Sequence, residues 1–197
     1  MSESGQAAPP PAEKPGRYQR TTGGLIGSMI VAVVLVLGVV VFREVFRDTP
    51  EVEPEPVDYL SSVAALQDTG RQVAYPPAVP AGWIVTSVTV ERGSRPGWAL
   101  GMLTDDGKYV GLRQQDEDVD DLVADLIDED ASQDGPATVE SALAGEWETY
   151  SDEGGDHGYA AELTTDVGEE TLLVYGSAPV ADIEVLIGLL TLDPVAG

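Results

Sequence analysis

The stretch WALGMLTDDGKYVGLRQ, residues 98–114, carries the clearest structural signal in the chain. Two runs that suit β-strands, Trp98–Thr104 and Lys108–Gln114, flank the pair Asp106-Gly107, and an Asp-Gly pair favours the tight turn of a β-hairpin. Gly101 and Gly111 lie inside the two runs, where glycine indicates a bulge or a close approach of the backbone, for example beneath an aromatic ring. The stretch therefore predicts an antiparallel sheet.

Further strands are expected on both sides of this hairpin. Runs rich in β-branched or aromatic residues predict strands at Ile84–Glu91, Glu146–Ser151, Tyr159–Thr165 and Thr171–Tyr175. The three prolines within Tyr75–Trp83 forbid a helix or a central strand there. The triplet Asp134-Gly135-Pro136 is expected to break the chain.

Three helices complete the expected domain. Asp58 caps a short helix that ends near Gly70, and Val119–Ile127 has the apolar spacing of an amphipathic helix, capped by Asp116 or Asp118. Ser177 is expected to cap the last helix, whose apolar face includes Val180, Ile183, Leu186, Ile187 and Leu190. The order predicts an α+β fold, an antiparallel sheet with helices packed on one or both faces.

A second signal lies far upstream, where residues 21–42, TTGGLIGSMIVAVVLVLGVVVF, contain no charge. As a helix this segment is roughly 33 Å long, enough to cross a hydrocarbon core of about 30 Å. It is longer than the apolar part of a signal peptide, and no small-residue cleavage site follows it. We therefore expect one uncleaved N-terminal transmembrane helix.

The flanks of this helix predict the topology and the domain boundaries. Three cationic residues precede it and two follow it, Arg43 and Arg47, so the positive-inside rule places residues 1–20 in the cytoplasm. The composition of residues 1–20 predicts a disordered tail. Residues 43–57 form a tether rich in proline and glutamate, 58–193 the exported α+β domain, and 194–197 a short tail. The predicted location is the cell membrane, with a single span and the C-terminal domain extracytoplasmic.

The charge of the exported part limits its partners. Of the 35 acidic residues only Glu3, Glu13 and Glu44 precede Asp48, so residues 48–197 hold 32 acids. The same residues hold five cations: Arg71, Arg92, Arg95, Lys108 and Arg113. So acidic a surface repels phosphate backbones, and we exclude nucleic acid as a partner. It is either a solvated surface or a binding surface for cations or a basic partner.

No metal or cofactor site is assigned from the sequence. The acids of residues 116–121 and 128–134 suggest calcium, but an EF-hand loop needs glycine at its sixth position and glutamate at its twelfth. Those positions hold Asp121 and Ile127 in the first segment, and Gln133 and Val139 in the second. There is no cysteine and a single histidine, His157, in a glycine-rich loop where we expect a surface turn.

No catalytic residue is assigned either. Whether the protein is an enzyme stays open, and the sequence favours a protein without enzymatic activity. The chain contains no G-x-S-x-G, no P-loop and no glycine-rich dinucleotide fingerprint. Paired carboxylates could serve glycoside hydrolysis, but chance proximity is expected among so many acids. The tryptophans and tyrosines are expected to pack in the core, with a ligand groove as the alternative: Trp83, Trp98, Trp147, Tyr75, Tyr109, Tyr150 and Tyr159.

Several short segments together resemble a known family: residues 57–59, 75–77, 79–83, 98–104, 109–112, 146–147 and 174–177. They are similar to the domain-of-unknown-function 4245 family, uncharacterised single-pass membrane proteins of actinobacteria. The resemblance implies the anchor and the exported domain but carries over no catalytic or binding residue. The proline-x-glycine-tryptophan segment 80–83 and the element order also resemble PsbP-like sandwiches, in fold alone.

The function expected from the sequence is a membrane-anchored envelope protein. Its acidic exported domain is predicted to act as an interaction module for an envelope protein or cell-wall partner. The alternatives are an exported domain that binds a small molecule or a cation, and an envelope hydrolase. The sequence does not indicate an oligomeric state.

Overall fold

The computed structural model describes residues 29, 56–93, 95–166 and 168–195. The expected transmembrane helix at 21–42 lies outside the described residues except for Met29, as do the tail 1–20 and most of the tether 43–57. Within the described ranges, no helix is long and apolar enough to cross a membrane. The membrane span therefore stays a prediction.

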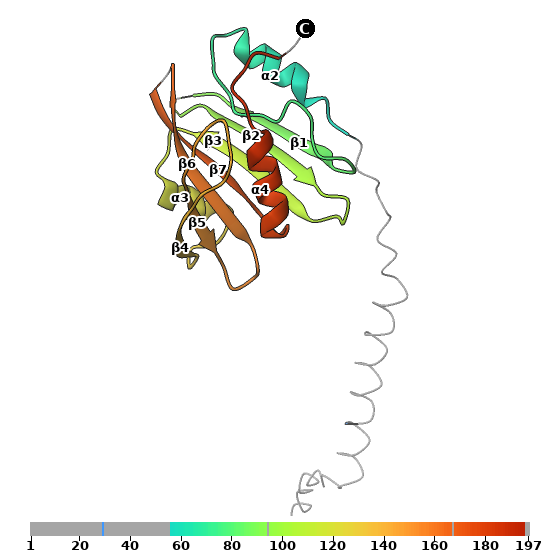
Figure 1. Cartoon of the computed structure of the whole chain (residues 1–197), viewed down its shortest axis with the longest axis vertical. Coiled ribbons are helices and arrows are strands. Elements are labelled where there is room, and N and C mark those ends of the chain that lie inside the picture. Colours follow the sequence, from blue (N-terminus) through green and yellow to red (C-terminus); the bar gives the residue numbers. More distant parts are fainter. Residues whose placement is uncertain (1–28, 30–55, 94, 167, 196–197) are drawn as a thin grey trace, which may run out of the picture. The chain divides into compact units, whose positions relative to one another are not determined.

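The described residues form one antiparallel sheet with three helices, which confirms the α+β prediction (Figure 1). The sheet order is β1-β2-β3-β7-β6-β5-β4, and each neighbouring pair is antiparallel. The strands are β1 (Ile84–Glu91), β2 (Gly97–Leu103), β3 (Tyr109–Gln115), β4 (Ser132–Ala137), β5 (Trp147–Ser151), β6 (His157–Thr165) and β7 (Gly168–Gly176). The helices are α2 (Tyr59–Gln67), α3 (Val119–Leu126) and α4 (Val180–Leu189). The likeness to PsbP stays a prediction.

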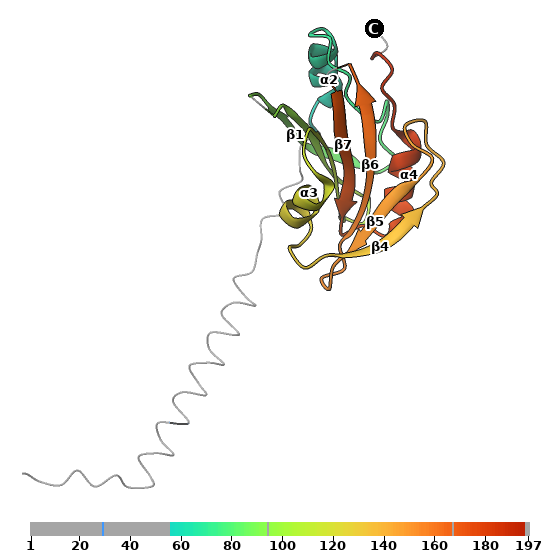
Figure 2. The same cartoon turned by 90° about the vertical axis from the view of Figure 1, so that its left-hand side faces the viewer.

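The two faces of the sheet differ in what covers them. The face that carries Trp98, Leu112 and Val174, here the inner face, packs against α2 and α4 and holds the main core. The opposite or outer face carries Leu173 and Tyr150 and packs against α3 in a smaller cluster. Figure 2 shows α3 and α4 on opposite sides of β6 and β7. Because α3 covers only part of the outer face, polar residues of that face remain accessible.

The glycines of the central hairpin allow close packing, as the sequence predicted. Gly101 and Gly111 face each other across β2 and β3. A methyl group on Gly111 would lie 2.6 Å from the Cζ atom of Tyr175 and 2.9 Å from the hydroxyl oxygen of Tyr109, and one on Gly101 would collide with the hydroxyl of Ser87. The bulge of this region lies on β1, opposite Gly101. Both glycines are needed because aromatic rings and a hydroxyl occupy the space of a side chain.

The expectation that Asp134-Gly135-Pro136 breaks the chain is wrong, because these residues lie within β4. A register shift between Gln133 and Gly135 and the left-handed backbone of Gly135, with φ at +109°, absorb the irregularity. Pro136 is tolerated because β4 is an edge strand, and proline lacks the N–H that a central strand needs. The expected strand boundaries also shift, since β6 begins at His157 and β7 at Gly168.

The helix caps match the sequence only in part. Asp58 caps α2 as expected, accepting a hydrogen bond of 3.3 Å from the backbone N–H three residues on. Asp118 is the N-cap residue of α3, but its side chain makes no capping hydrogen bond. The expected cap of α4 by Ser177 is wrong: Pro179 is the N-cap residue, and the Ser177 hydroxyl accepts the backbone N–H of Tyr109 instead. A tertiary contact has taken the place of a local one.

A buried polar network joins the segment after α2 to the sheet. The carboxylate of Glu170 on β7 accepts hydrogen bonds from Arg71 at 2.9 Å and from the side-chain amide of Gln114 at 2.7 Å. The amide oxygen of Gln114 in turn accepts the backbone N–H of Ala74 at 2.7 Å, and the indole of Trp98 donates to the Ala74 carbonyl. Side-chain exposure is 10% for Arg71 and 2% for Glu170, so this ion pair is shielded from water.

The substitution Glu170→Ala is expected to destabilise the protein by about 3–5 kcal/mol, because it leaves the buried guanidinium of Arg71 without its carboxylate. The carbonyls of Pro96 and Gln72 would stay as acceptors for Arg71 and Gln114 but carry no compensating charge. Denaturant unfolding of the full chain measures this change. The exposed neighbour Glu169 is the matched control, and Glu169→Ala should cost less than about 0.5 kcal/mol. An equal loss of unfolding free energy in the two variants would show that the buried network does not stabilise the protein more than an exposed glutamate does.

Alkaline pH is expected to weaken the packing of α4 on β6. The Tyr159 hydroxyl donates to Glu184 at 3.0 Å, and burial followed by this hydrogen bond raises the pKa of Tyr159 to about 12. An unfolded tyrosine titrates near pH 10, so this contribution is complete below pH 10 and is lost as pH rises toward 12. The free energy of unfolding should fall by up to about 1.4 kcal/mol per pH unit more in wild type than in Tyr159→Phe. Parallel pH profiles for the two proteins would contradict this assignment.

Candidate functional site

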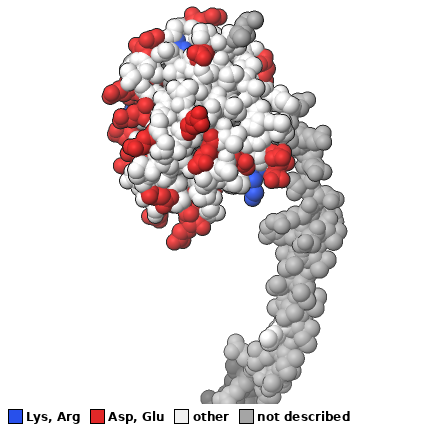
Figure 3. Space-filling model, in the orientation of Figure 1, with Lys and Arg blue, Asp and Glu red and all other residues white. Residues whose placement is uncertain are grey.

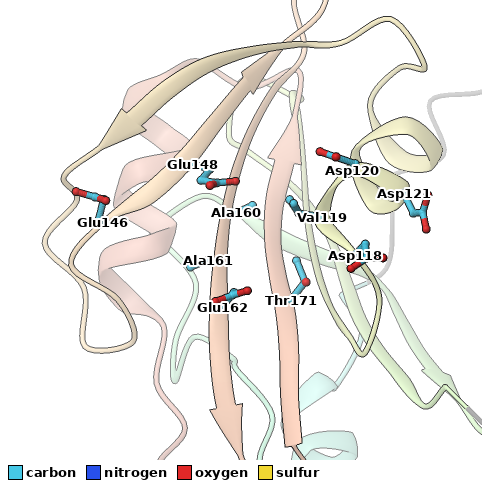
Figure 4. A pocket seen from close by; sticks show the side chains of 10 residues that line it. All are labelled: Asp118, Val119, Asp120, Asp121, Glu146, Glu148, Ala160, Ala161, Glu162 and Thr171. Carbon is cyan, nitrogen blue, oxygen red and sulfur yellow. The ribbon is translucent and has the colours of Figure 1, made fainter.

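A groove on the outer face, between α3 and strands β5 and β6, is the candidate functional site. Its volume is about 600 Å³, and a second hollow of about 400 Å³ shares four of its residues, Asp118, Asp121, Glu162 and Thr171. We call the two together the acidic groove. The first hollow is lined by Asp118, Val119, Asp120, Asp121, Glu146, Glu148, Ala160, Ala161, Glu162 and Thr171 (Figure 4). The second adds Arg95, Asp116, Glu117, Glu169 and Glu170.

The strand register places the floor and one wall of the groove. Glu148 on β5 faces Ala160 on β6, and Glu162, two residues further along β6, faces Thr171 on β7. Residues two apart on a strand point to the same face, so both glutamates lie on the outer face. Ala160 is buried and small, which leaves room above it between the two carboxylates. Figure 4 shows Glu148 and Glu162 on neighbouring strands of this face.

Helix α3 forms the other wall. Leu122 and Val123 are buried and fix the helix on the outer face through Tyr150, Leu173 and their neighbours. The first turn carries Asp120 and Asp121, where the positive end of the helix dipole stabilises negative charge. The sequence predicted this helix and its acidic first turn, but not that the turn faces a second row of acids on the sheet.

The groove is strongly negative. Arg95 is its one cationic lining residue within the described part of the chain, and it already pairs with Glu117 at 2.8 Å. Glu170 is used by Arg71 in the buried network. Eight lining carboxylates have no ion pair among the described residues: Asp116, Asp118, Asp120, Asp121, Glu146, Glu148, Glu162 and Glu169. Figure 3 shows that acidic residues also dominate another view of the surface.

One groove carboxylate is held in place by a tyrosine. The hydroxyl of Tyr150 donates a hydrogen bond of 2.9 Å to the Oε2 atom of Glu148. Burial of Tyr150, followed by this hydrogen bond, raises the pKa of its hydroxyl above the ordinary value. Glu148 is therefore an oriented acceptor.

The geometry does not favour a single metal ion. In the part of the chain that the structure describes, no three histidine, cysteine, aspartate or glutamate side chains are close enough to hold one. The groove acids come from α3, β5, β6, β7 and the segments that precede α3 and β5, and they are spread along its walls. A partner with several positive charges at intervals suits this spacing better than one ion.

The second acidic segment lies elsewhere, beyond the end of α3. Asp128 and Asp130 line a separate shallow hollow together with Asp152, and Asp134 is not among its lining residues. Asp128 accepts the backbone N–H of Asp130, and Asp152 that of Asp156, as side chains in turns commonly do. The structure thus brings Asp128, Asp130 and Ser132 of this alternating segment to one hollow and leaves Asp134 outside its lining.

The structure also shows where the single histidine and the aromatic residues singled out in the sequence lie. His157 is half-buried at the start of β6, opposite Ser151, so the expectation of a surface turn is wrong. The expectation that the aromatic residues pack in the core is confirmed for all except Tyr109, which is 37% exposed. The acidic groove is lined by none of these rings, so it is not the aromatic ligand groove of the alternative.

Comparison with solved structures gives a weak likeness. The crystal structure of MucB in complex with MucA(peri) has 15% identity and a TM-score of 0.38, covering 61% of this chain and 36% of that one. The complex structure of Pseudomonas aeruginosa MucA/MucB gives 15% identity and a TM-score of 0.36, covering 61% and 35%. This chain thus matches only about a third of the length of either protein, and the likeness carries no argument about function.

Sequence comparison is more informative. No curated protein matches the chain. A family match, however, covers residues 17–190, most of the chain, and confirms the resemblance found in the sequence. The chain belongs to the family described as Protein of unknown function (DUF4245).

Proposed function

We propose that this protein is a membrane-anchored, exported binding module whose acidic groove holds a cationic segment of a partner polypeptide. The observation that carries the proposal is the set of eight groove carboxylates without an ion pair among the described residues. Acids that face one another across a groove repel, and a cationic partner relieves that repulsion. Lysine and arginine side chains spaced along a peptide match the spread of these acids.

Two alternatives have less support. A small molecule usually binds in a mostly apolar pocket with a few polar groups, whereas carboxylates dominate this groove. A hydrolase with a serine nucleophile needs a base beside it, and no hydrogen bond joins His157 to a serine among the described residues. A hydrolase with two carboxylates would need substrate in the groove, a case that the test below also addresses.

The proposed location rests on the sequence. The uncharged segment 21–42 has the length of a membrane span, and the cations around it favour a cytoplasmic N-terminus. The tether would hold the domain outside the membrane, where basic segments of envelope proteins are available partners.

A labelled decalysine peptide should bind the full chain, and Glu148→Gln with Glu162→Gln should weaken the binding about three- to tenfold. Each lost pair in a half-open groove contributes up to about 1 kcal/mol. Glutamine keeps the acceptor for Tyr150, so the fold should survive. Fluorescence anisotropy measures the affinity, which should fall as salt rises because ions screen these pairs.

The matched control is Asp105→Asn with Asp106→Asn, which removes two exposed charges from the β2–β3 turn. It changes the net charge by the same amount, so it separates a groove effect from general attraction to an acidic protein. Equal affinities of the two double variants would overturn the proposal.

Topology can be tested separately. A reporter that is active only outside the cytoplasm, fused after Gly197, should be active, because the proposal places the C-terminus outside. Fusion of the same reporter before residue 1 should be silent. The reverse pattern would contradict the proposed orientation.

A further inference from the structure

Strand β1 ends the sheet with an open edge. It pairs with β2 on one side, and the sheet order of the described residues places no strand beyond it. Among the described residues, β1 makes one backbone hydrogen bond to a segment outside the sheet. The N–H of Val57 donates this bond to the carbonyl of Val85, over 2.9 Å. Residues 87–91 then run in regular register with β2. Their outward N–H and C=O groups are available to pair with another extended backbone.

The opposite edge of the sheet, strand β4, is protected against pairing with another strand. On β4 a register shift, a glycine with left-handed backbone and Pro136 interrupt the hydrogen-bonding edge. The regular part of β1 holds no proline, glycine or lysine. Proteins usually block exposed edges against unwanted pairing, so an unblocked edge beside a blocked one marks a surface for strand addition.

A hollow of about 420 Å³ lies between α2 and the end of β1. One wall comes from α2 and the residues after it, including Ala65 and Leu66, and the other from the end of β1, including Val90. Added strands gain affinity from backbone hydrogen bonds and specificity from pockets that take alternate side chains. The hollow is placed to take one side chain of a strand that pairs with β1.

The charge of this end selects the partner. Three of the cations near this end already pair within the domain: Arg71 with Glu170, Arg95 with Glu117 and Arg113 with Glu91. Arg71 and Arg92 line the hollow, and Arg92 is exposed and makes no ion pair among the described residues. The Nε atom of Arg71 is buried without a hydrogen-bond partner in the described part of the chain. Arg92 is therefore the lining cation that stays available to a carboxylate among the described residues.

We propose that the edge of β1 and the adjoining hollow form a second docking surface, which binds an extended polypeptide strand ending in a carboxylate over Arg92. The strand pairs with residues 87–91 and places an apolar side chain between α2 and Val90. This surface is separate from the acidic groove. Its partner carries a negative charge, whereas the partner of the groove is cationic.

The test uses an acetylated heptapeptide of alternating threonine and valine with leucine as its penultimate residue and a free C-terminal carboxylate. Titration into the isotopically labelled full chain should give saturable NMR shifts at the amides of β1 and of residues 62–71. The same peptide with an amidated C-terminus should bind about three- to fivefold more weakly, the worth of one exposed ion pair.

Two variants locate the site. Arg92→Glu should weaken the acid peptide at least about threefold, and Ala65→Trp, at an exposed position in the wall of the hollow, should reduce it further by filling the space. Lys108→Glu is the matched control, because it makes the same charge change at the other end of the hairpin and should leave binding unchanged. Absence of β1 shifts at millimolar peptide, shifts confined to β4 or the acidic groove, or equal losses in Arg92→Glu and Lys108→Glu would overturn the proposal.

Discussion

The buried carboxylate of Glu170 is the contact on which the arrangement of this domain depends. It binds Arg71 and Gln114, and Gln114 in turn holds the backbone of Ala74, so the segment after α2 is fixed across the end of the sheet. A buried ion pair tolerates no missing partner, and here the hydrogen bonds around it are largely satisfied. The network thereby positions α2 beside β1 and forms the wall of the hollow there.

The same strand links this network to the acidic groove. Because side chains alternate along β7, Glu170 points to the inner face while Glu169 and Thr171 point to the outer face. All three residues line the acidic groove, but the carboxylate of Glu170 is bonded within the buried network. One strand thus supplies a core anchor and part of the candidate binding surface. Substitutions on β7 are therefore expected to affect stability where the side chain points to the inner face, and binding where it points to the outer face.

Much of the fold follows from local sequence. The bounds of β1, the hairpin around Asp106-Gly107 and the amphipathic pattern of α3 agree with expectation, because each depends on residues close in the chain. The strand β4 was missed because Gly135 and Pro136 break a central strand but not an edge, and edge position is a property of the whole sheet. Ser177 likewise bonds to Tyr109 on a distant strand, which no local cap rule foresees.

The candidate site was less accessible to prediction. The sequence identified an acidic surface and the acidic turn of α3, yet gave no reason to choose Glu148 or Glu162 among so many acids. Their meeting depends on the register of β5, β6 and β7, three strands that join only after folding. The single glutamate beside apolar residues on each of β5 and β6 was the available signal, since a polar residue in such a strand indicates its solvent-facing side.

The two proposed surfaces give one domain two kinds of partner contact, a negative groove on the outer face and an edge whose turn gathers the few cations. The central claim is that the groove itself receives a cationic polypeptide. A spin-labelled lysine decapeptide tests this most directly, through paramagnetic broadening of the amide signals of the full chain. The account predicts broadening at Glu148, Glu162 and the first turn of α3, with the β2–β3 turn unaffected. Uniform broadening over the whole acidic surface would contradict it.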